Sequence, residues 1–156
     1  MSALIRPDPN YRPLRIQRKR TKGWRMPPNT VSVTRPGRWG NPFDARLLGP
    51  DLAVEMFRDL MSGFFDPFKL KHLSDEEFAS LHVAKESWLG RLNWGNELRA
   101  GARSELRGKN LACFCPLCER HRDGKPLNIA CSDCSPCHVD PLGETANDFI
   151  CEAIAA

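Results

Sequence analysis

The cysteines are the residues of this sequence best suited to chemistry. Six of the seven lie between positions 113 and 137, in short groups separated by a polar stretch. Such crowding serves either a metal or disulfide bonds. The N-terminus lacks the apolar segment and cleavage site of a signal peptide, and no apolar run approaches the roughly 20 residues of a bilayer span. We therefore expect a cytoplasmic protein without a membrane partner, whose reduced thiols favour metal binding over disulfides.

The spacing of four of these cysteines fits a zinc site. Zinc takes four tetrahedral ligands from thiolates and imidazoles, and two Cys-x2-Cys turns separated by about 12–20 residues commonly supply them. Cys115 and Cys118 form one such turn, and Cys131 and Cys134 form the other after twelve residues. The sequence therefore predicts a bound Zn2+ with these four cysteines as ligands.

Other ligand sets stay open. Four further residues could replace a sulfur or bind a second metal, namely Cys113, Cys137, His121 and His138. Cys113 and His138 are also candidates for catalysis, because a thiolate can act as a nucleophile and an imidazole as a general acid or base. The alternative is that Cys137 and His138 only complete a metal site or cap the fold.

A second candidate site is the loop from Arg35 to Phe43. Its two prolines and two glycines exclude a helix or a sheet ladder. An arginine can hold a phosphate, a tryptophan can stack on a base, and a glycine lets a ligand approach the backbone. The predicted substrate-binding residues are Arg35, Arg38, Trp39, Gly40 and Asn41. Trp39 and Phe43 could equally be core residues that pin a tight loop.

The elements that position these residues indicate an α/β domain with a small parallel or mixed sheet flanked by helices. Residues 31–34 alternate as a strand should, and 111–114 form a compact apolar run. Four helices are predicted. The first begins at Pro50, the second begins at a Ser74–Glu77 capping box and runs towards Leu92, and the third covers 95–106. In the fourth, Asp140 is the N-cap and Pro141 the first helical residue. If the two strands are parallel, the loops at their carboxyl ends, 35–43 and 113–138, meet at one edge of the sheet.

Charge is distributed unevenly along the chain. Residues 1–40 hold ten basic residues and one acid, a net charge of +9, whereas the remainder carries −5. We predict a basic extended arm at 1–30 and a single α/β domain at 31–156, with a zinc-binding insertion at 115–137. A basic arm favours a polyanionic partner, such as nucleic acid or a nucleotide; equally, it could dock on its own acidic body.

Three blocks of the sequence carry a resemblance to a known family. They are Arg35-Pro-Gly-Arg-Trp-Gly-Asn-Pro-Phe43, Leu106-Arg-Gly-Lys-Asn-Leu-Ala-Cys-Phe-Cys115 and Cys137-His-Val-Asp140. They are similar to the signatures, roughly G-R-x-x-x-W-G-N-P-F, L-x-G-K-x-L-x-C-x-C and C-H-x-D, of a bacterial and phage family of domains of unknown function. The resemblance implies that Cys113, Cys115, Cys137 and His138 form a shared metal or active site, and that the Cys118–Cys134 excursion is an elaboration.

Two functional hypotheses follow from these patterns. The first is a zinc-containing domain that binds a nucleotide or nucleic-acid component between the Arg35–Phe43 loop, Cys113 and His138, with processing of that ligand as a further option. The second is a non-catalytic module that binds nucleic acid or protein and uses zinc structurally. The sequence leaves open whether the protein is an enzyme.

Overall fold

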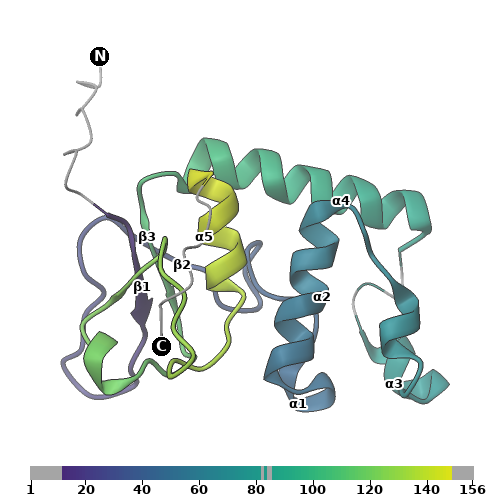
Figure 1. Cartoon of the computed structure of the whole chain (residues 1–156), viewed down its shortest axis with the longest axis horizontal. Helices are drawn as coiled ribbons and strands as arrows, with labels where there is room; N and C mark the ends of the chain where they lie inside the picture. Colours follow the sequence, from purple (N-terminus) through teal and green to yellow (C-terminus); the bar gives the residue numbers. More distant parts are fainter. Residues whose placement is uncertain (1–11, 82, 84–85, 149–156) are drawn as a thin grey trace.

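A mixed four-stranded sheet carries the cysteine-rich segment (Figure 1). The computed structural model describes residues 12–81, 83 and 86–148. Within this part of the chain the strands are β1 (Leu14–Gln17), β2 (Thr30–Ser32), β3 (Asn110–Cys113) and β4 (Lys125–Pro126), in the spatial order β2-β3-β1-β4. β3 runs parallel to both of its neighbours, and β4 pairs antiparallel with β1. The predicted α/β class, a mixed sheet and the parallel pairing of the two predicted strands are confirmed.

β1 lies within the segment expected to be an extended arm. It occupies an inner position of the sheet, where Arg15 pairs with Leu111 and Ile16 with Ala112. Arg15 and Ile16 are both buried. The sequence did not suggest a strand here because a buried arginine interrupts the apolar pattern, and its partner is far along the chain. Residues 14–17, predicted as part of an extended arm, therefore form a strand of the sheet, and residues 1–11 of the predicted arm lie outside the described residues.

Five α-helices are formed by the described residues: α1 (Ala45–Leu48), α2 (Pro50–Ser62), α3 (Asp75–Ser80), α4 (Trp88–Gly101) and α5 (Val139–Asn147). α4 continues into a short π-helical segment, Ala102–Leu106. Figure 1 shows α4 lying across one end of α2 and α5, with the sheet beside α5. None of these described helices combines the length and apolar character that crossing a membrane requires.

The single helix expected to run from Ser74 towards Leu92 is two helices. α3 begins with the predicted capping box, in which Ser74 and Glu77 exchange side-chain to backbone hydrogen bonds, but it ends at Ser80. Ser87 then caps α4, because its Oγ accepts a hydrogen bond from the Gly90 N–H at 3.0 Å. α4 therefore runs straight through position 95, where a third helix was predicted to begin. A Cβ at Gly95 would lie 2.0 Å from the Leu60 carbonyl oxygen, so this glycine allows α4 to cross α2 closely.

The start of α5 also differs from the prediction. The helix begins at Val139 with His138 at the N-cap position, and the Asp140 side chain does not cap it. Instead, the Asp140 carboxylate bonds to Arg15 of β1. The tertiary partner outcompetes the local cap because a buried guanidinium needs a counter-charge.

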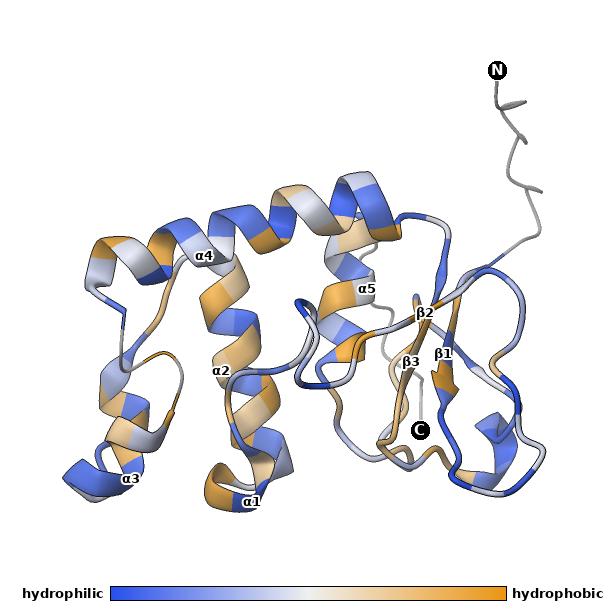
Figure 2. Ribbon diagram, turned by 180° about the vertical axis from the view of Figure 1, so that it is seen from behind, coloured by the Kyte–Doolittle hydropathy of each residue, from blue (hydrophilic) through white to orange (hydrophobic). Residues whose placement is uncertain are grey.

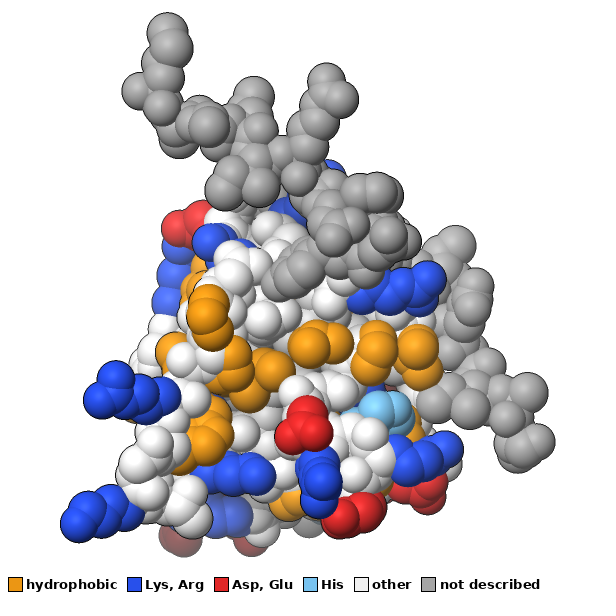
Figure 3. Space-filling model, turned by 90° about the vertical axis from the view of Figure 1, so that its left-hand side faces the viewer, with side chains coloured by type: hydrophobic (Ala, Val, Ile, Leu, Met, Phe, Trp, Pro, Cys, Tyr) orange, Lys and Arg blue, Asp and Glu red, His pale blue; other side chains and the backbone are white. Residues whose placement is uncertain are grey.

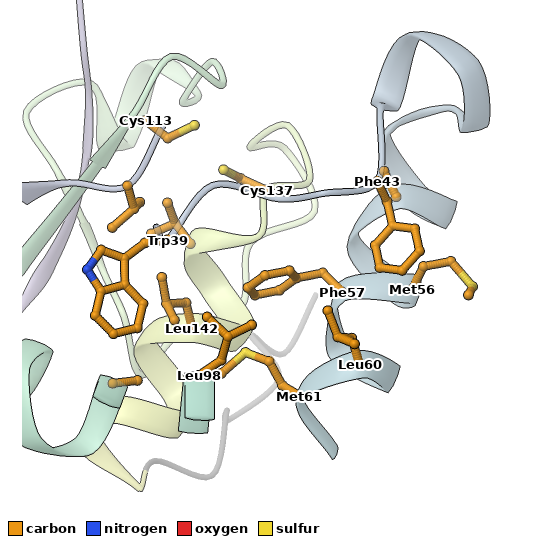
Figure 4. Packing of buried hydrophobic residues seen from close by; sticks show 14 of the residues in the cluster. Trp39, Phe43, Met56, Phe57, Leu60, Met61, Leu98, Cys113, Cys137 and Leu142 are labelled. Carbon is orange, nitrogen blue, oxygen red and sulfur yellow. The ribbon is translucent and has the colours of Figure 1, made fainter. Parts of the chain in front are cut away.

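The core lies between the sheet and helices α2, α4 and α5. Figure 2 shows apolar residues along β3 and on one face of α2, and β3 is buried at all four positions. Figure 4 shows side chains from α2, α4 and α5 meeting those of the Arg35–Phe43 loop. The labelled members of this cluster are Trp39, Phe43, Met56, Phe57, Leu60, Met61, Leu98, Cys113, Cys137 and Leu142. One end of this core is therefore built from residues next to the candidate site.

Candidate functional site

Four donors of the Cys-rich insertion form one compact group, the four-donor cluster: Cys118, His121, Cys131 and Cys134. Their ligand atoms all lie within 4.8 Å of one another. Cys118 Sγ is 3.9 Å from Cys131 Sγ and 3.6 Å from Cys134 Sγ. His121 Nδ1 is 3.3 Å from Cys118 Sγ and 3.5 Å from Cys134 Sγ. Donors placed tetrahedrally at about 2.3 Å from a zinc ion are about 3.8 Å apart, so this group has the dimensions of a single metal site.

Short local structures hold the four-donor cluster together. A 3-10 turn at Glu119–His121 brings the imidazole back onto Cys118. The Cys118 N–H donates to Cys134 Sγ at 3.4 Å, and the Ser135 N–H donates to the Pro116 carbonyl at 3.0 Å. Burial lowers the pKa of His121, as do neighbouring cations. The imidazole is therefore neutral near pH 7, which is the form that binds metals.

The membership of the four-donor cluster differs in one position from the ligand set expected from the spacing. The structure brings Cys118, Cys131 and Cys134 together, with His121 as the fourth donor, and places Cys115 elsewhere. Cys115 lies two residues after Cys113, the last residue of β3, so the strand carries it to the sheet edge. The signal for His121 was its position three residues after Cys118, the reach of one 3-10 turn.

The second group, the thiol trio, consists of Cys113, Cys115 and Cys137. Their sulfurs lie within 4.8 Å of one another, and Cys113 Sγ is 3.8 Å from Cys115 Sγ. Cys113 ends β3 and Cys137 precedes α5, and Figure 4 shows these two side chains directed towards each other. Cys137 is 2% exposed and Cys113 is 9% exposed. The trio thus joins the strand end to the helix start.

Hydrogen bonding within the thiol trio separates the pKa values of its members. The Cys115 and Cys137 thiols bond to the Cys113 sulfur and lower the pKa of Cys113. The same interactions raise the pKa of Cys115 and Cys137. Without a metal the trio therefore stabilises one thiolate, because three negative charges at this distance would repel each other strongly.

His138 lies beside the trio but is oriented by the loop. Its Nε2 is 2.8 Å from the Val33 carbonyl oxygen, and a carbonyl only accepts, so Nε2 carries the proton. The Nδ1 lone pair then faces Cys137 Sγ at 3.7 Å. The ring packs edge-on against Phe57, with centroids 5.2 Å apart. Burial lowers the pKa of His138, so the imidazole is neutral.

A pocket of about 420 Å3 opens over the thiol trio and His138. The two loops expected to meet at the carboxyl edge of the parallel strands both line it, which agrees with the topology rule for such sheets. The residues that supply its polar and aromatic lining beyond the trio include Arg20, Arg35, Asn41, Phe43, Phe114 and His138. Arg20 lies over the Phe114 ring, with the guanidinium 4.6 Å from the centroid.

The predicted substrate-binding residues fall into two groups. Arg35 and Asn41 line the pocket, and Arg35 Nη2 lies 3.6 Å from Asp44 Oδ1. Trp39 is a core residue that does not line the pocket, and Arg38 covers its ring at 4.4 Å while bonding to Glu105.

Gly40 has a structural role in the same loop. A Cβ at Gly40 would lie 2.8 Å from the Arg35 Cα, so glycine lets the loop close on itself. Asn41 also shapes the turn, because its Nδ2 donates to the Ala53 carbonyl and its Oδ1 accepts from the Phe43 N–H.

A buried ion cluster that the sequence did not reveal links the site to the sheet. Arg15 Nη1 lies 3.0 Å from Asp140 Oδ2, and Lys125 Nζ lies 3.1 Å from Asp140 Oδ1. Arg15 Nη2 also donates to the Ser135 carbonyl at 2.7 Å, next to Cys134. Arg15 and Lys125 are each 1% exposed. The cluster therefore ties β1, the insertion and α5 into one frame, and no local sequence pattern relates its three members.

The fold and the site define a small α/β domain with two groups of metal-type donors at one edge of its sheet. The chain belongs to the family described as Domain of unknown function (DUF4326), whose model matches residues 16–148. This agrees with the resemblance to a family of domains of unknown function. No curated protein and no solved structure matches the chain.

Proposed function

We propose that this protein is a zinc-binding domain whose pocket takes a nucleotide. The observation that carries the proposal is the pocket of about 420 Å3 at the sheet edge, which has two arginines in its lining and the thiol trio beside them. In this proposal the zinc is structural and sits in the four-donor cluster. The ligand binds in the pocket, which is lined by the thiol trio and by none of the four donors of the cluster.

The choice of zinc rests on the donor set. Three thiolates and one imidazole are soft to borderline ligands, and a tetrahedral arrangement of this composition suits zinc. The sulfur separations of 3.6 and 3.9 Å agree with a single tetrahedral ion. The ion would hold the insertion together, since its regular structure is limited to the Glu119–His121 turn and the two residues of β4, and between Cys118 and Cys134 Leu127 is its member of the hydrophobic core.

The choice of a nucleotide rests on the pocket lining. Arg20 and Arg35 supply positive charge, and no carboxylate is among the described residues that line the pocket. Phe114, which is half-buried, adds aromatic surface next to these cations, whereas Phe43 is a core residue with 1% exposure. A guanidinium binds phosphate oxygens in a bidentate manner, and an aromatic ring stacks on a base. The volume lies within the range of pockets that hold small ligands, roughly 300–1,000 Å3.

Calorimetric titration of the zinc-loaded protein with nucleoside monophosphates and diphosphates tests this proposal. We expect Arg35→Ala to weaken binding by about 10- to 100-fold, since a charge-assisted hydrogen bond contributes about 1.5–3 kcal/mol. The matched control is Arg103→Ala, because Arg103 is half exposed, pairs with Asp148 and does not line the pocket. Equal affinities in both variants, or no binding by the wild type, would overturn the proposal.

A second candidate function, nucleic-acid binding, is favoured by the loop between β1 and β2. Residues 18–29 contain five basic residues and no acid, and four of the five are exposed. Figure 3 shows that, on the side of the molecule where the sheet lies, basic side chains are more prominent than acidic ones. Arg15 does not contribute to this surface because it is buried against Asp140.

Salt dependence of binding to a short DNA duplex, followed by fluorescence anisotropy, tests the second candidate. The logarithm of the affinity falls as the logarithm of the salt concentration rises. If Lys22 and Arg25 contact phosphates, changing both to Ala makes this fall shallower, reducing the magnitude of the slope by about 2. The control is the double variant Arg99→Ala, Arg103→Ala, which should leave the slope unchanged. Arg99 lies on α4 and Arg103 on the π-helical segment that follows it. A shallow slope in the wild type would exclude this function.

A further inference from the structure

We propose that the thiol trio is a second metal site, with one coordination position open to the pocket for a nitrogen donor of the bound base. The identity of that donor rests on the proposed nucleotide function, whereas the metal site itself depends only on the trio. The arrangement differs from the four-donor cluster in having three donors instead of four. Three protein ligands plus an open position are the pattern of reactive zinc sites, as four protein ligands are of structural ones.

The dimensions of the trio suit one ion. The Cys113 and Cys115 sulfurs are 3.8 Å apart, which is close to the separation of about 3.8 Å expected for two thiolates on one tetrahedral zinc ion. The Cys137 sulfur lies within 4.8 Å of both. The three thiols come from the end of β3, the residue two positions later and the start of α5. The fold thus sets their separation without requiring a metal to assemble them.

The fourth position faces the pocket. All three cysteines line the pocket, and no carboxylate does so among the described residues. His138 Nδ1 lies near Cys137, but the described donors that lie within 4.8 Å of one another here are the three sulfurs alone. The hydrogen bond from His138 Nε2 to the Val33 carbonyl holds the ring in its present place. The open position is therefore assigned to a group bound in the pocket and not to His138.

Charge favours a neutral donor at this position. Three thiolates around a divalent ion carry a net charge of −1, which disfavours a phosphate oxygen as the fourth ligand. A ring nitrogen of a base adds no charge. The phosphate of the same ligand is then left for Arg20 and Arg35, which line the pocket with the trio. One nucleotide can in this way satisfy both the metal and the arginines.

Metal stoichiometry tests the site itself. Native mass spectrometry of the zinc-loaded chain is expected to show two ions for the wild type and one for Cys115→Ser. Cys115 is the least buried of the trio, so this variant disturbs packing least. The matched control is Cys151→Ser, which changes the one cysteine outside the described residues and should keep two ions. One ion in the wild type, or two in Cys115→Ser, would overturn the site.

The open position is tested with Co2+ in place of zinc and imidazole as the probe. We expect imidazole to shift the visible absorption bands of the Co2+-loaded wild type and to leave those of Cys115→Ser unchanged. The imidazole response of the wild type can be measured by itself, so the test does not depend on whether Cys115→Ser folds. Bands in the wild type that do not respond would mean that a fourth protein donor, such as His138, closes the site, and would overturn the inference.

The two proposals can fail separately. Two bound ions with an imidazole response, but without nucleotide binding, would leave the metal site standing and remove the nucleotide function. If the chain instead holds one ion and binds a nucleotide in a manner that depends on Arg35, the nucleotide function stands and the second metal site is removed.

Discussion

The two sulfur groups of this domain differ in how the chain assembles them. The four-donor cluster draws its ligands from Cys118 to Cys134, a single stretch with little regular structure. The thiol trio joins the end of β3 to the start of α5 and lies against the core. A group built from one stretch with little regular structure needs the metal to fold that stretch. A group built between packed elements is positioned before any metal arrives, which is what a binding or reactive site requires.

Their surroundings reinforce this contrast. The four-donor cluster lies beside exposed charged residues. Arg120 bonds to Asp133 at 2.9 Å and lies 3.7 Å from Cys131 Sγ, and these two contacts are at the surface. Around the trio lie the pocket, the buried imidazole of His138 and the arginines of the pocket wall. We therefore propose a stabilising role for the first group and a ligand-binding role for the second, and three substitutions test that division.

The largest effect is expected for Cys134→Ser in the four-donor cluster. Loss of a structural metal belongs to the few mechanisms that cost at least about 4 kcal/mol of unfolding free energy. Urea denaturation of the zinc-loaded protein measures the loss. The same comparison after treatment with a chelator should show a much smaller difference between wild type and variant. An equal difference would mean that Cys134, which is 5% exposed, acts through packing and not through a metal.

A smaller loss is expected for Asp140→Asn, which removes the counter-charge shared by Arg15 and Lys125. Breaking a buried ion pair costs about 3–5 kcal/mol, and we expect the lower end because the Asp140 side chain is 24% exposed. Thermal and urea denaturation measure it.

The matched control for this change is Asp148→Asn. Asp148 is half exposed and pairs with Arg103 and Arg107, so its loss should cost about 0–1 kcal/mol. Its left-handed backbone conformation, with φ 54°, also accepts asparagine readily. Similar losses for the two variants would show that the buried ion cluster does not hold the two sulfur groups in one frame.

The smallest effect on stability is expected for Cys115→Ser in the thiol trio. β3 and α5 are held by sheet pairing and core packing, so we expect about 1 kcal/mol from the substitution itself, the usual size for a point mutation, plus only the linkage contribution of the second ion. Urea denaturation at the same zinc concentration as for Cys134→Ser provides the comparison. A loss as large as that of Cys134→Ser would remove the distinction between a stabilising and a binding group.

Much of the fold was predictable because its signals are local. The capping box at Ser74, the apolar face of α2 and the alternation that predicted a strand at 31–34 depend on neighbouring residues. The first two are observed, and the strand is observed one to two residues earlier, as β2 at Thr30–Ser32. β1 was missed because its buried Arg15 reads as a surface residue until Asp140 is seen to neutralise it. The break between α3 and α4 was missed because the apolar spacing continued past the Ser87 cap, although Trp88 and Leu89 are exposed.

The sequence by itself determined that sulfur donors gather after β3, and it identified Cys118, Cys131 and Cys134 as one group, because closely spaced ligands can meet through local turns alone. It also placed the Arg35–Phe43 loop at the same sheet edge, through the rule for parallel strands. For Cys115 the spacing and the family resemblance gave different partners, the first Cys118, Cys131 and Cys134, the second Cys113, Cys137 and His138. Only the tertiary structure decided between them, placing Cys115 with Cys113 and Cys137 and His121 fourth in the four-donor cluster. That choice depends on how β3 pairs with β1 and where α5 begins, and these are contacts between residues up to 125 positions apart.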